Sequence, residues 1–230
     1  VEEIRDLRQT LSEEEKITLM VAFLLHDLGH GPFSHAFESV TTAKHEEMTR
    51  RIILEDTEVH RALVRCCPSL PECVAAVIDH THPNKILVQM ISGQLDADRM
   101  DYLLRDAYFT GTKYGEFDLE RILRTIRVRD HKMVVKESGM HSVEDYIMAR
   151  YHMYWQVYFH PVSRSFESML ALTFARLKQL RQHHSPILEQ IPIFNAFLEG
   201  KSVSPQDHFL MDESACNYGF TLLRQCTDPI

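Results

Sequence analysis

Apolar residues recur at helical spacing along most of this chain, and that pattern constrains its fold more than any other feature. Residues 17–25, 85–104 and 142–158 each place apolar side chains three or four positions apart, on one face of a helix. Only residues 126–136 alternate with period two, around a polar turn at 130–132, which indicates a β-hairpin. The sequence therefore predicts an all-α fold with one small β-hairpin.

Capping and breaking residues mark where the predicted helices begin and end. Ser12 and Glu15 form a capping box, and we expect the helix that they open to run to Gly29. A Gly-Pro pair then breaks the chain before a short element at residues 35–40. The remaining helices are expected from about residue 44 and over residues 59–66, 71–80, 85–110, 117–125, 142–158 and 161–183.

Composition excludes several classes of protein. The 230 residues carry 25 Lys and Arg against 33 Asp and Glu, a net charge of −8, and this acidic balance argues against a sequence-independent nucleic-acid binder. No apolar run approaches the roughly 18 residues that a membrane span needs, and no secretory signal is visible. Five cysteines without a repeated CxxC spacing indicate a reducing compartment. We expect a cytoplasmic protein with neither membrane nor nucleic-acid partners.

Three histidines and an aspartate crowd residues 26–35, at the expected end of an apolar helix. Neighbouring helical residues point about 100° apart, so His26 and Asp27 converge on one ion only where the helix ends. Imidazole nitrogen and carboxylate oxygen together suit a divalent metal. The segment predicts a metal site, with a structural His-Asp pair as the alternative.

Two stripes of polar and aromatic residues are each spaced by four residues, which places every stripe on one helix face. A solvated acidic face is the alternative for the first stripe, and an aromatic core helix is the alternative for the second. If the two stripes instead line a pocket, they bring carboxylate, tyrosine and arginine side chains to its walls. The first stripe is Asp98, Tyr102 and Asp106, and the second is Arg150, Tyr154 and Tyr158.

These residues carry a resemblance to the HD-domain phosphohydrolase superfamily, and within it to bacterial deoxynucleoside triphosphate (dNTP) triphosphohydrolases related to the mammalian SAM- and HD-domain enzyme. The likeness lies in HDLGHGPFSHAFE at 26–38, KHEE at 44–47 and LDADRMDYLLRDAYFTGTKYGEFDLERILRTIRV at 95–128. It implies the HD-domain helical fold and hydrolysis of a dNTP to deoxynucleoside and inorganic triphosphate. Residues 1–185 would form the catalytic core and residues 186–230 a C-terminal helical extension, expected to be truncated.

The resemblance also implies a divalent metal (Mg, Mn, Fe or Zn) held by an H…HD…D set. His26 and Asp27 match the HD pair, and Asp98 matches the last ligand. The first histidine of the set should precede His26, yet residues 1–25 contain none. We therefore expect that ligand elsewhere in a longer protein, of which this sequence is a part.

Further histidines are expected at the phosphates by the same resemblance, with His30, His35, His45 and Glu46 as catalytic residues. An imidazole with a pKa of about 6.5 can give a proton at neutral pH, so His35 or His45 would protonate the departing alkoxide. Glu38 or Glu46 would orient it. A structural hydrogen bond is the alternative role for His30, and Glu46 has a structural alternative as well.

The resemblance extends to the substrate. Arginine forks suit phosphate oxygens, a tyrosine against C2′ would leave no room for a ribose hydroxyl, and Asp106 could accept from the sugar 3′-hydroxyl. The expected substrate-binding residues are Arg99, Tyr102, Asp106, Arg150, Tyr154 and Tyr158.

Relatives of this kind bind a regulatory nucleotide between subunits, so a homo-oligomer (dimer or tetramer) and a dGTP- or GTP-type activator are expected. The residues expected to bind this nucleotide are basic, namely Arg121, Arg124, Arg127 and Lys136. The alternative is that they form a solvated helix or hairpin face.

Two other functions stay open. One is a different HD activity, such as a nucleotide phosphodiesterase or an alarmone hydrolase, against which the Asp-Arg-Met-Asp-Tyr stripe argues. The other is a catalytically inactive HD module that binds nucleotides as a regulator, which the missing upstream histidine favours. His80 and His82 have metal-like spacing but are assigned to structure, because no partner ligand is apparent.

Overall fold

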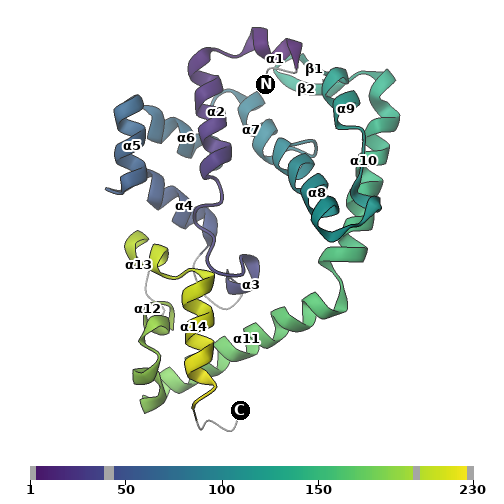
Figure 1. Ribbon diagram of the computed structural model, residues 1–230. Helices are drawn as coiled ribbons and strands as arrows, with labels where there is room; N and C mark the ends of the chain where they lie inside the picture. The colour runs from purple at the N-terminus through teal and green to yellow at the C-terminus, as the bar shows by residue number, and fades with distance from the viewer. Residues whose placement is uncertain (1–3, 39–43, 199–202, 227–230) are drawn as a thin grey trace. The chain divides into compact units, whose positions relative to one another are not determined.

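The computed structural model describes residues 4–38, 44–198 and 203–226, and Figure 1 shows a chain of α-helices joined by short turns. The strands of the described residues form one two-stranded antiparallel sheet, so the predicted all-α fold with one hairpin is confirmed. No helix in these ranges is both long and apolar enough to cross a membrane. The chain divides into two compact units, residues 1–25 with 63–161 and residues 26–62 with 162–230. The expected domain boundary at residue 185 stays a prediction.

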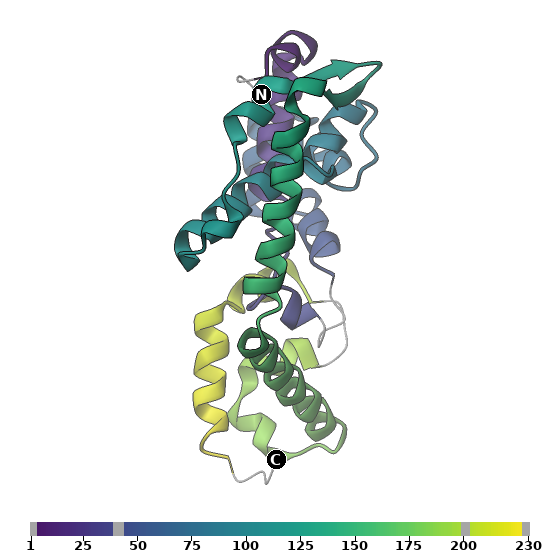
Figure 2. The same cartoon turned by 90° about the vertical axis from the view of Figure 1, so that its right-hand side faces the viewer.

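In the first unit, α2 contacts α6 and α7, whereas α10 contacts α8 and α9. Figure 2 shows α10 as the long green helix that descends from the hairpin side of this unit. Its elements are α1 Arg5–Thr10, α2 Glu13–Leu25, α6 Leu70–Ile78, α7 Lys85–Ser92, α8 Ala97–Thr110, η1 Lys113–Gly115, α9 Leu119–Thr125, β1 Ile126–Arg129, β2 Lys132–Val135, η2 Glu137–Gly139, α10 Met140–Met153 and η3 Tyr154–Tyr158. Helix α5 Glu58–Cys66 runs from the second unit into the first.

The second unit has an aromatic core. Phe174 lies edge-on to both Phe37 and Phe194, with ring centroids 5.3 Å apart in each pair. Phe37 and Ile52 belong to this core, so the short helices α3 and α4 pack on C-terminal segments of the chain. The unit comprises α3 His35–Glu38, α4 His45–Leu54, α11 Pro161–Gln182, η4 Pro186–Gln190, η5 Pro192–Phe194, α12 Asn195–Leu198, α13 Pro205–Leu210 and α14 Glu213–Leu223.

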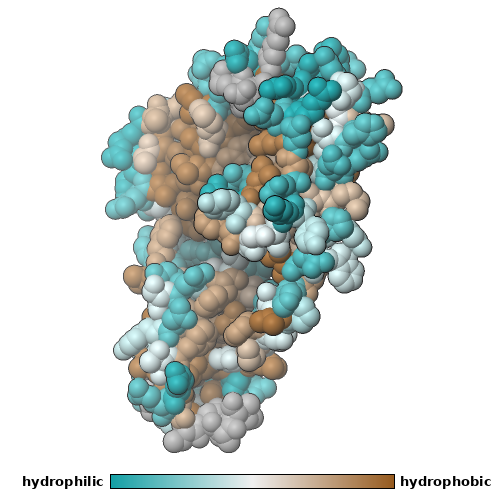
Figure 3. Space-filling view, turned by 45° about the vertical axis from the view of Figure 1, so that its right-hand side comes forward, coloured by the Kyte–Doolittle hydropathy of each residue, from teal (hydrophilic) through white to brown (hydrophobic). Residues whose placement is uncertain are grey.

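Helix α11 also carries large apolar side chains that stay exposed, namely Val162, Phe166, Met169 and Leu172. Apolar surface, coloured brown, is visible over this unit in the lower part of Figure 3.

The capping box is present, because the Ser12 N–H donates to Glu15 Oε2 over 2.9 Å and the Glu15 N–H donates to Ser12 Oγ over 3.2 Å. The expected end of this helix at Gly29 was wrong, since α2 stops at Leu25. The His26 carbonyl accepts from the Thr49 hydroxyl, and the His30 N–H donates to the Asp27 carbonyl, which closes a tight turn. A contact distant in sequence therefore ends the helix before the glycine.

The helix expected from residue 85 ends before Gly111 as expected, but its continuity was wrong. It is two helices, because α7 ends at Ser92 and α8 begins at Ala97. The Asp96 carboxylate accepts from the Arg99 N–H over 2.7 Å and so caps α8. Similarly, α10 ends at Met153 and a π-helical turn takes its place over Tyr154–Tyr158.

The hairpin matches its prediction closely. Arg129 pairs with Lys132, which leaves Asp130 and His131 as a two-residue loop. Both residues have positive φ, 50° and 58°. That conformation is typical of a type I′ turn, whose twist matches that of the strands.

Candidate active site

His26 and Asp27 lie in the turn that follows α2, formed by residues 26–29. We call it the His-Asp turn. His26 Nε2 lies 3.3 Å from Asp27 Oδ2, and His30 Nε2 lies 3.5 Å from Asp27 Oδ1. The hydrogen bond with His30 lowers the pKa of Asp27 against the opposing effect of burial, and the same contact raises the pKa of His30. The Asp27 side chain is 58% exposed. An ionised carboxylate and an imidazole therefore lie next to each other and within reach of solvent.

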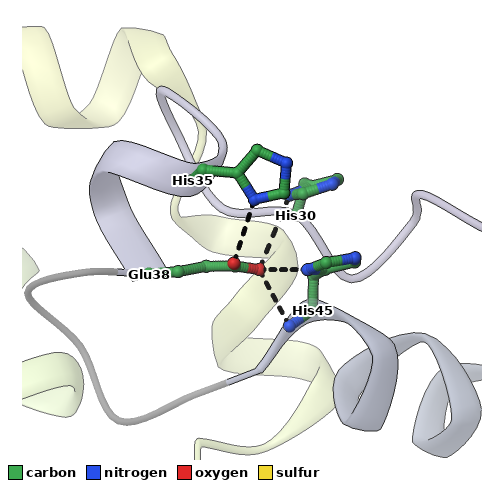
Figure 4. Close-up of side chains that lie close together, drawn as sticks. All are labelled: His30, His35, Glu38 and His45. Atoms are coloured by element: carbon green, nitrogen blue, oxygen red, sulfur yellow. Dashed lines mark hydrogen bonds and ion pairs between the residues drawn. The ribbon is translucent and has the colours of Figure 1, made fainter. Parts of the chain in front are cut away.

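Three histidines surround one carboxylate in the second unit, as Figure 4 shows. Glu38, at the end of α3, accepts at Oε2 from His35 Nδ1 over 3.2 Å. Its Oε1 accepts from both the ring Nδ1 and the backbone N–H of His45, the first residue of α4. His30 Nδ1 lies 3.7 Å from the same oxygen. We call His30, His35, Glu38 and His45 the histidine cluster.

The central carboxylate fixes how the rings are presented. A carboxylate that faces Nδ1 favours the Nδ1–H tautomer, so His35 and His45 turn their Nε2 atoms away from Glu38 (Figure 4). Burial raises the pKa of Glu38, but the hydrogen bonds from His35 and His45 outweigh it and hold that pKa below its usual range. The Nε2 atoms are thereby left to contact a ligand.

Two sets of donors in this unit fit a divalent ion. His26 and Asp27 supply neighbouring imidazole and carboxylate donors, a combination that Zn, Fe and Mn accept. In the histidine cluster, one ligand atom from each residue lies within 4.8 Å of all the others. His30 Nδ1 is buried there and makes no hydrogen bond among the described residues.

Glu38 is one of the two carboxylates expected to orient the catalytic histidine. The structure places it at the centre of the histidine cluster. Glu46 is exposed on the first turn of α4, so its catalytic role stays a prediction. The spacing of His35 and Glu38, three residues apart on a helix, is the sequence signal that favours Glu38.

The two predicted stripes lie together in the first unit. The Tyr158 hydroxyl donates to Asp106 Oδ2 over 2.5 Å, and the Tyr102 and Tyr158 ring centroids are 6.2 Å apart. The Arg150 guanidinium lies over the Tyr154 ring, 5.7 Å from its centroid. The four-residue spacing therefore holds through a π-helical turn, an element that is frequent at functional sites.

Burial governs the ionisation of these tyrosines. It raises the pKa of Tyr102 to about 12, and burial together with the Asp106 carboxylate raises the pKa of Tyr158 still further. Both hydroxyls are consequently neutral hydrogen-bond donors at physiological pH.

The N-terminal turn of α8 carries Asp98 and Arg99, both partly buried. Arg99 Nε pairs with Asp96 Oδ2 over 3.1 Å, and burial of Asp96 raises the pKa of that carboxyl. The sequence did not single out Asp96, although an Asp directly before the first residue of a helix is a capping signal. The grouping of Asp98 with His26 and Asp27 in one metal site stays a prediction.

The basic residues expected at a regulatory site bond mostly to their own segment. Arg121 donates to the Ser138 carbonyl over 3.0 Å, and Arg124 pairs with Glu120 over 2.8 Å. Arg127 donates to two backbone carbonyls, and Lys136 is exposed. Their role in nucleotide binding stays a prediction.

His82 has a structural contact, because its Nδ1 accepts from the Asn84 N–H over 3.2 Å. That bond agrees with its assignment to structure.

Known families match both halves of the chain. The HD domain matches residues 2–106, and the HD associated region matches residues 117–190. The first match contains the His-Asp turn, the histidine cluster and Asp98.

Individual relatives agree with this assignment. The chain is 51% identical, over its whole length and 53% of the relative, to the uncharacterized protein YwfO of Bacillus subtilis. It is 29% identical, over 74% of this chain and 35% of the relative, to the deoxynucleoside triphosphate triphosphohydrolase SAMHD1 homolog of Dictyostelium discoideum. The crystal structure of a phosphohydrolase from Bacteroides thetaiotaomicron superposes with a TM-score of 0.81 at 29% identity, over 99% of this chain and 58% of that one.

The chain thus spans between about a third and a half of the length of these curated relatives. Its motifs, its helical fold and both family matches agree, and the chain belongs to the HD-domain superfamily.

Proposed function

We propose that this chain carries the active site of a metal-dependent phosphohydrolase that converts a dNTP to deoxynucleoside and inorganic triphosphate. The histidine cluster is the observation that carries this proposal. Two imidazoles hydrogen bonded to one carboxylate and a third 3.7 Å from it, beside a His-Asp turn, supply proton donors next to metal ligands. The similarity to the Dictyostelium deoxynucleoside triphosphate triphosphohydrolase homolog gives the proposal its substrate class.

His26, Asp27 and Asp98 are the residues that would hold the metal. A divalent ion, when bound, polarises a phosphoryl oxygen and lowers the pKa of water. Asp27 suits this role because its pKa is lowered and its side chain is open to solvent.

The leaving alkoxide needs a proton, and His35 is our candidate for the donor. Its side chain is 76% exposed, whereas those of His30 and His45 are largely buried. Glu38 holds His35 by Nδ1, so Nε2 can reach a bound substrate. His30 and His45 would bind phosphate oxygens from the deeper part of the cluster.

The first unit supplies a surface suited to a deoxynucleoside. Asp106 and Tyr158 form one hydrogen-bonded pair against the Tyr102 ring, which suits contact with the sugar and its 3′-hydroxyl. Arg99 and Arg150 would bind phosphate oxygens, and Tyr154 would pack on the base. We extend the proposal to a homo-oligomeric, cytoplasmic protein with a dGTP- or GTP-type activator near Arg121, Arg124, Arg127 and Lys136.

The test uses the full-length protein with each of the four dNTPs and Mn²⁺, with and without dGTP, and identifies the phosphate product. Inorganic triphosphate supports the proposal. Pyrophosphate, or hydrolysis of alarmones in place of dNTPs, would indicate a different HD activity. Tight nucleotide binding without turnover would indicate a regulatory module.

A further inference from the structure

A single buried hydroxyl closes the turn that carries the His-Asp pair. Thr49 Oγ1 donates to the His26 carbonyl over 2.9 Å and accepts from the Gly29 N–H over 2.9 Å. Both ends of the four-residue turn are therefore attached to one oxygen atom. Asp27 lies between these two attachment points, so the backbone on either side of it is fixed.

Helix α4 places this hydroxyl next to the histidine cluster. His45 and Thr49 are four residues apart on α4 and so share one face of the helix. The same face leaves no space beside the turn, because a Cβ added at Gly29 would come within 1.9 Å of the His45 carbonyl oxygen and 2.5 Å of the Thr49 backbone nitrogen. The helix that contributes a histidine to the cluster thus also holds the His-Asp turn.

Water cannot replace the hydroxyl easily at this position. Thr49 is 0% exposed and Gly29 is buried. Removal of the hydroxyl would leave the Gly29 N–H without its partner, and a buried unpaired donor favours rearrangement of the turn.

The same turn is held from a second direction. His208, on α13, is only 6% exposed, and the backbone of Leu28 and of His30 lies close enough to its ring to act on its pKa against the effect of burial. Arg51 of α4 donates to the Val203 carbonyl over 2.6 Å, just before α13. The segment that holds the turn from this side is thereby tied to the helix that holds it from the other.

We propose that Thr49, supported by His208, is a positioning residue that holds His26 and Asp27 in the arrangement that binds metal. Neither side chain needs to touch the substrate or the ion. This inference rests on the proposed function only for the effect on turnover, because metal affinity can be measured without any nucleotide.

The chain offers a matched control in Thr57. This residue is 6% exposed and lies in the same unit, and its hydroxyl also bridges a carbonyl and an N–H, those of Ile52 (2.5 Å) and His60 (3.1 Å). It makes neither of its hydrogen bonds to the His-Asp turn. The Thr57→Val change removes the same chemistry elsewhere, so it reports the cost of losing a buried hydroxyl as such.

The experiment measures three quantities in the full-length protein for wild type, Thr49→Val, Thr49→Ser and Thr57→Val. They are the Mn²⁺ dissociation constant from electron paramagnetic resonance titration, the kcat for dNTP hydrolysis and the thermal midpoint. Loss of a group that orients metal ligands typically weakens metal binding by about 10- to 100-fold. We expect that loss in Thr49→Val, wild-type affinity in Thr49→Ser, and a lowered midpoint with wild-type affinity in Thr57→Val.

Equal Mn²⁺ affinities in Thr49→Val and Thr57→Val would overturn the inference. If wild type hydrolyses no dNTP while Thr49→Val still loses metal, the proposed function fails and the positioning role stands. Should Thr49→Val not fold, His208→Leu and His208→Gln replace it. Metal loss in the leucine variant, with retention in the glutamine variant, supports the inference, and unchanged affinity in both contradicts it.

Discussion

Tyr158 donates its hydroxyl hydrogen to Asp106 across 52 residues of sequence, over 2.5 Å. The bond joins the π-helical turn after α10 to the middle of α8 and turns the Tyr158 ring toward Tyr102, edge to face at 75°. Both side chains are partly buried. The pair therefore gives this part of the first unit a fixed polar and aromatic surface.

Removal of that hydroxyl tests the substrate surface. Tyr158→Phe keeps the ring beside Tyr102 but leaves Asp106 without this donor, and a hydrogen bond to a charged group contributes about 1.5–3 kcal/mol. We expect KM for dNTPs to rise several-fold, because Asp106 is no longer held in place by this bond, and the free energy of unfolding to fall by no more than that amount. Steady-state kinetics and urea unfolding measure both. An unchanged KM with a large loss of stability would show that the bond is structural only.

Two carboxylates compete for the role of orienting the histidines. Glu38→Gln removes the charge that His35 and His45 face, and general acid catalysis contributes typically about 10²–10⁴-fold. We expect kcat to fall within that range. Glu46→Gln, on the exposed first turn of α4, should lower kcat less. A larger loss in Glu46→Gln than in Glu38→Gln would reverse this assignment.

The pH dependence of stability tests the burial of His208. Burial lowers the pKa of His208 from its usual 6.5, so the unfolded chain binds this proton more readily than the folded one. Stability from this group is present above 6.5 and is lost as pH falls from 6.5 toward the lowered value. His30 acts with the opposite sign, because its pKa is raised. A difference measurement is therefore required.

Urea unfolding of wild type and His208→Gln at several pH values between 5 and 8 supplies that difference. The wild type should lose more free energy of unfolding than the variant as the pH is lowered through 6.5. Parallel pH profiles for the two proteins would refute the burial of a neutral His208.

The hairpin loop offers a stabilising change. His131 adopts a left-handed conformation, with φ of 58°, which costs a non-glycine residue about 1–2 kcal/mol. Glycine avoids that cost but loses more chain entropy on folding, so His131→Gly should raise the free energy of unfolding by about 0.5–1 kcal/mol. Urea unfolding measures it, and hydrolysis should not change. A decrease in stability would mean that the turn is not type I′ in solution.

Local patterns were sufficient to predict much of the fold. The Ser12 capping box, the period-two segment at 126–136 and the spacing of Arg150, Tyr154 and Tyr158 all depend on neighbours within a few residues. Each appears in the structure with the expected contacts.

The features that could not be predicted depend on contacts distant in sequence. The end of α2 at Leu25 follows from a hydroxyl on α4, and the central place of Glu38 follows from the return of the chain to His45. The break after Ser92 is an exception, because the Asp96 cap is a local signal. It was missed because the apolar spacing continues across the break. The participation of His208 required the packing of α13 against the turn, which no local pattern encodes.

In the proposed reaction, water attacks phosphorus and releases the deoxynucleoside from an intact triphosphate. Hydrolysis of a dNTP by the full-length protein in water labelled with heavy oxygen tests it most directly, with mass spectrometry of both products. We predict one labelled oxygen in inorganic triphosphate and none in the deoxynucleoside. Labelled deoxynucleoside monophosphate or pyrophosphate, or label in the deoxynucleoside itself, would contradict it.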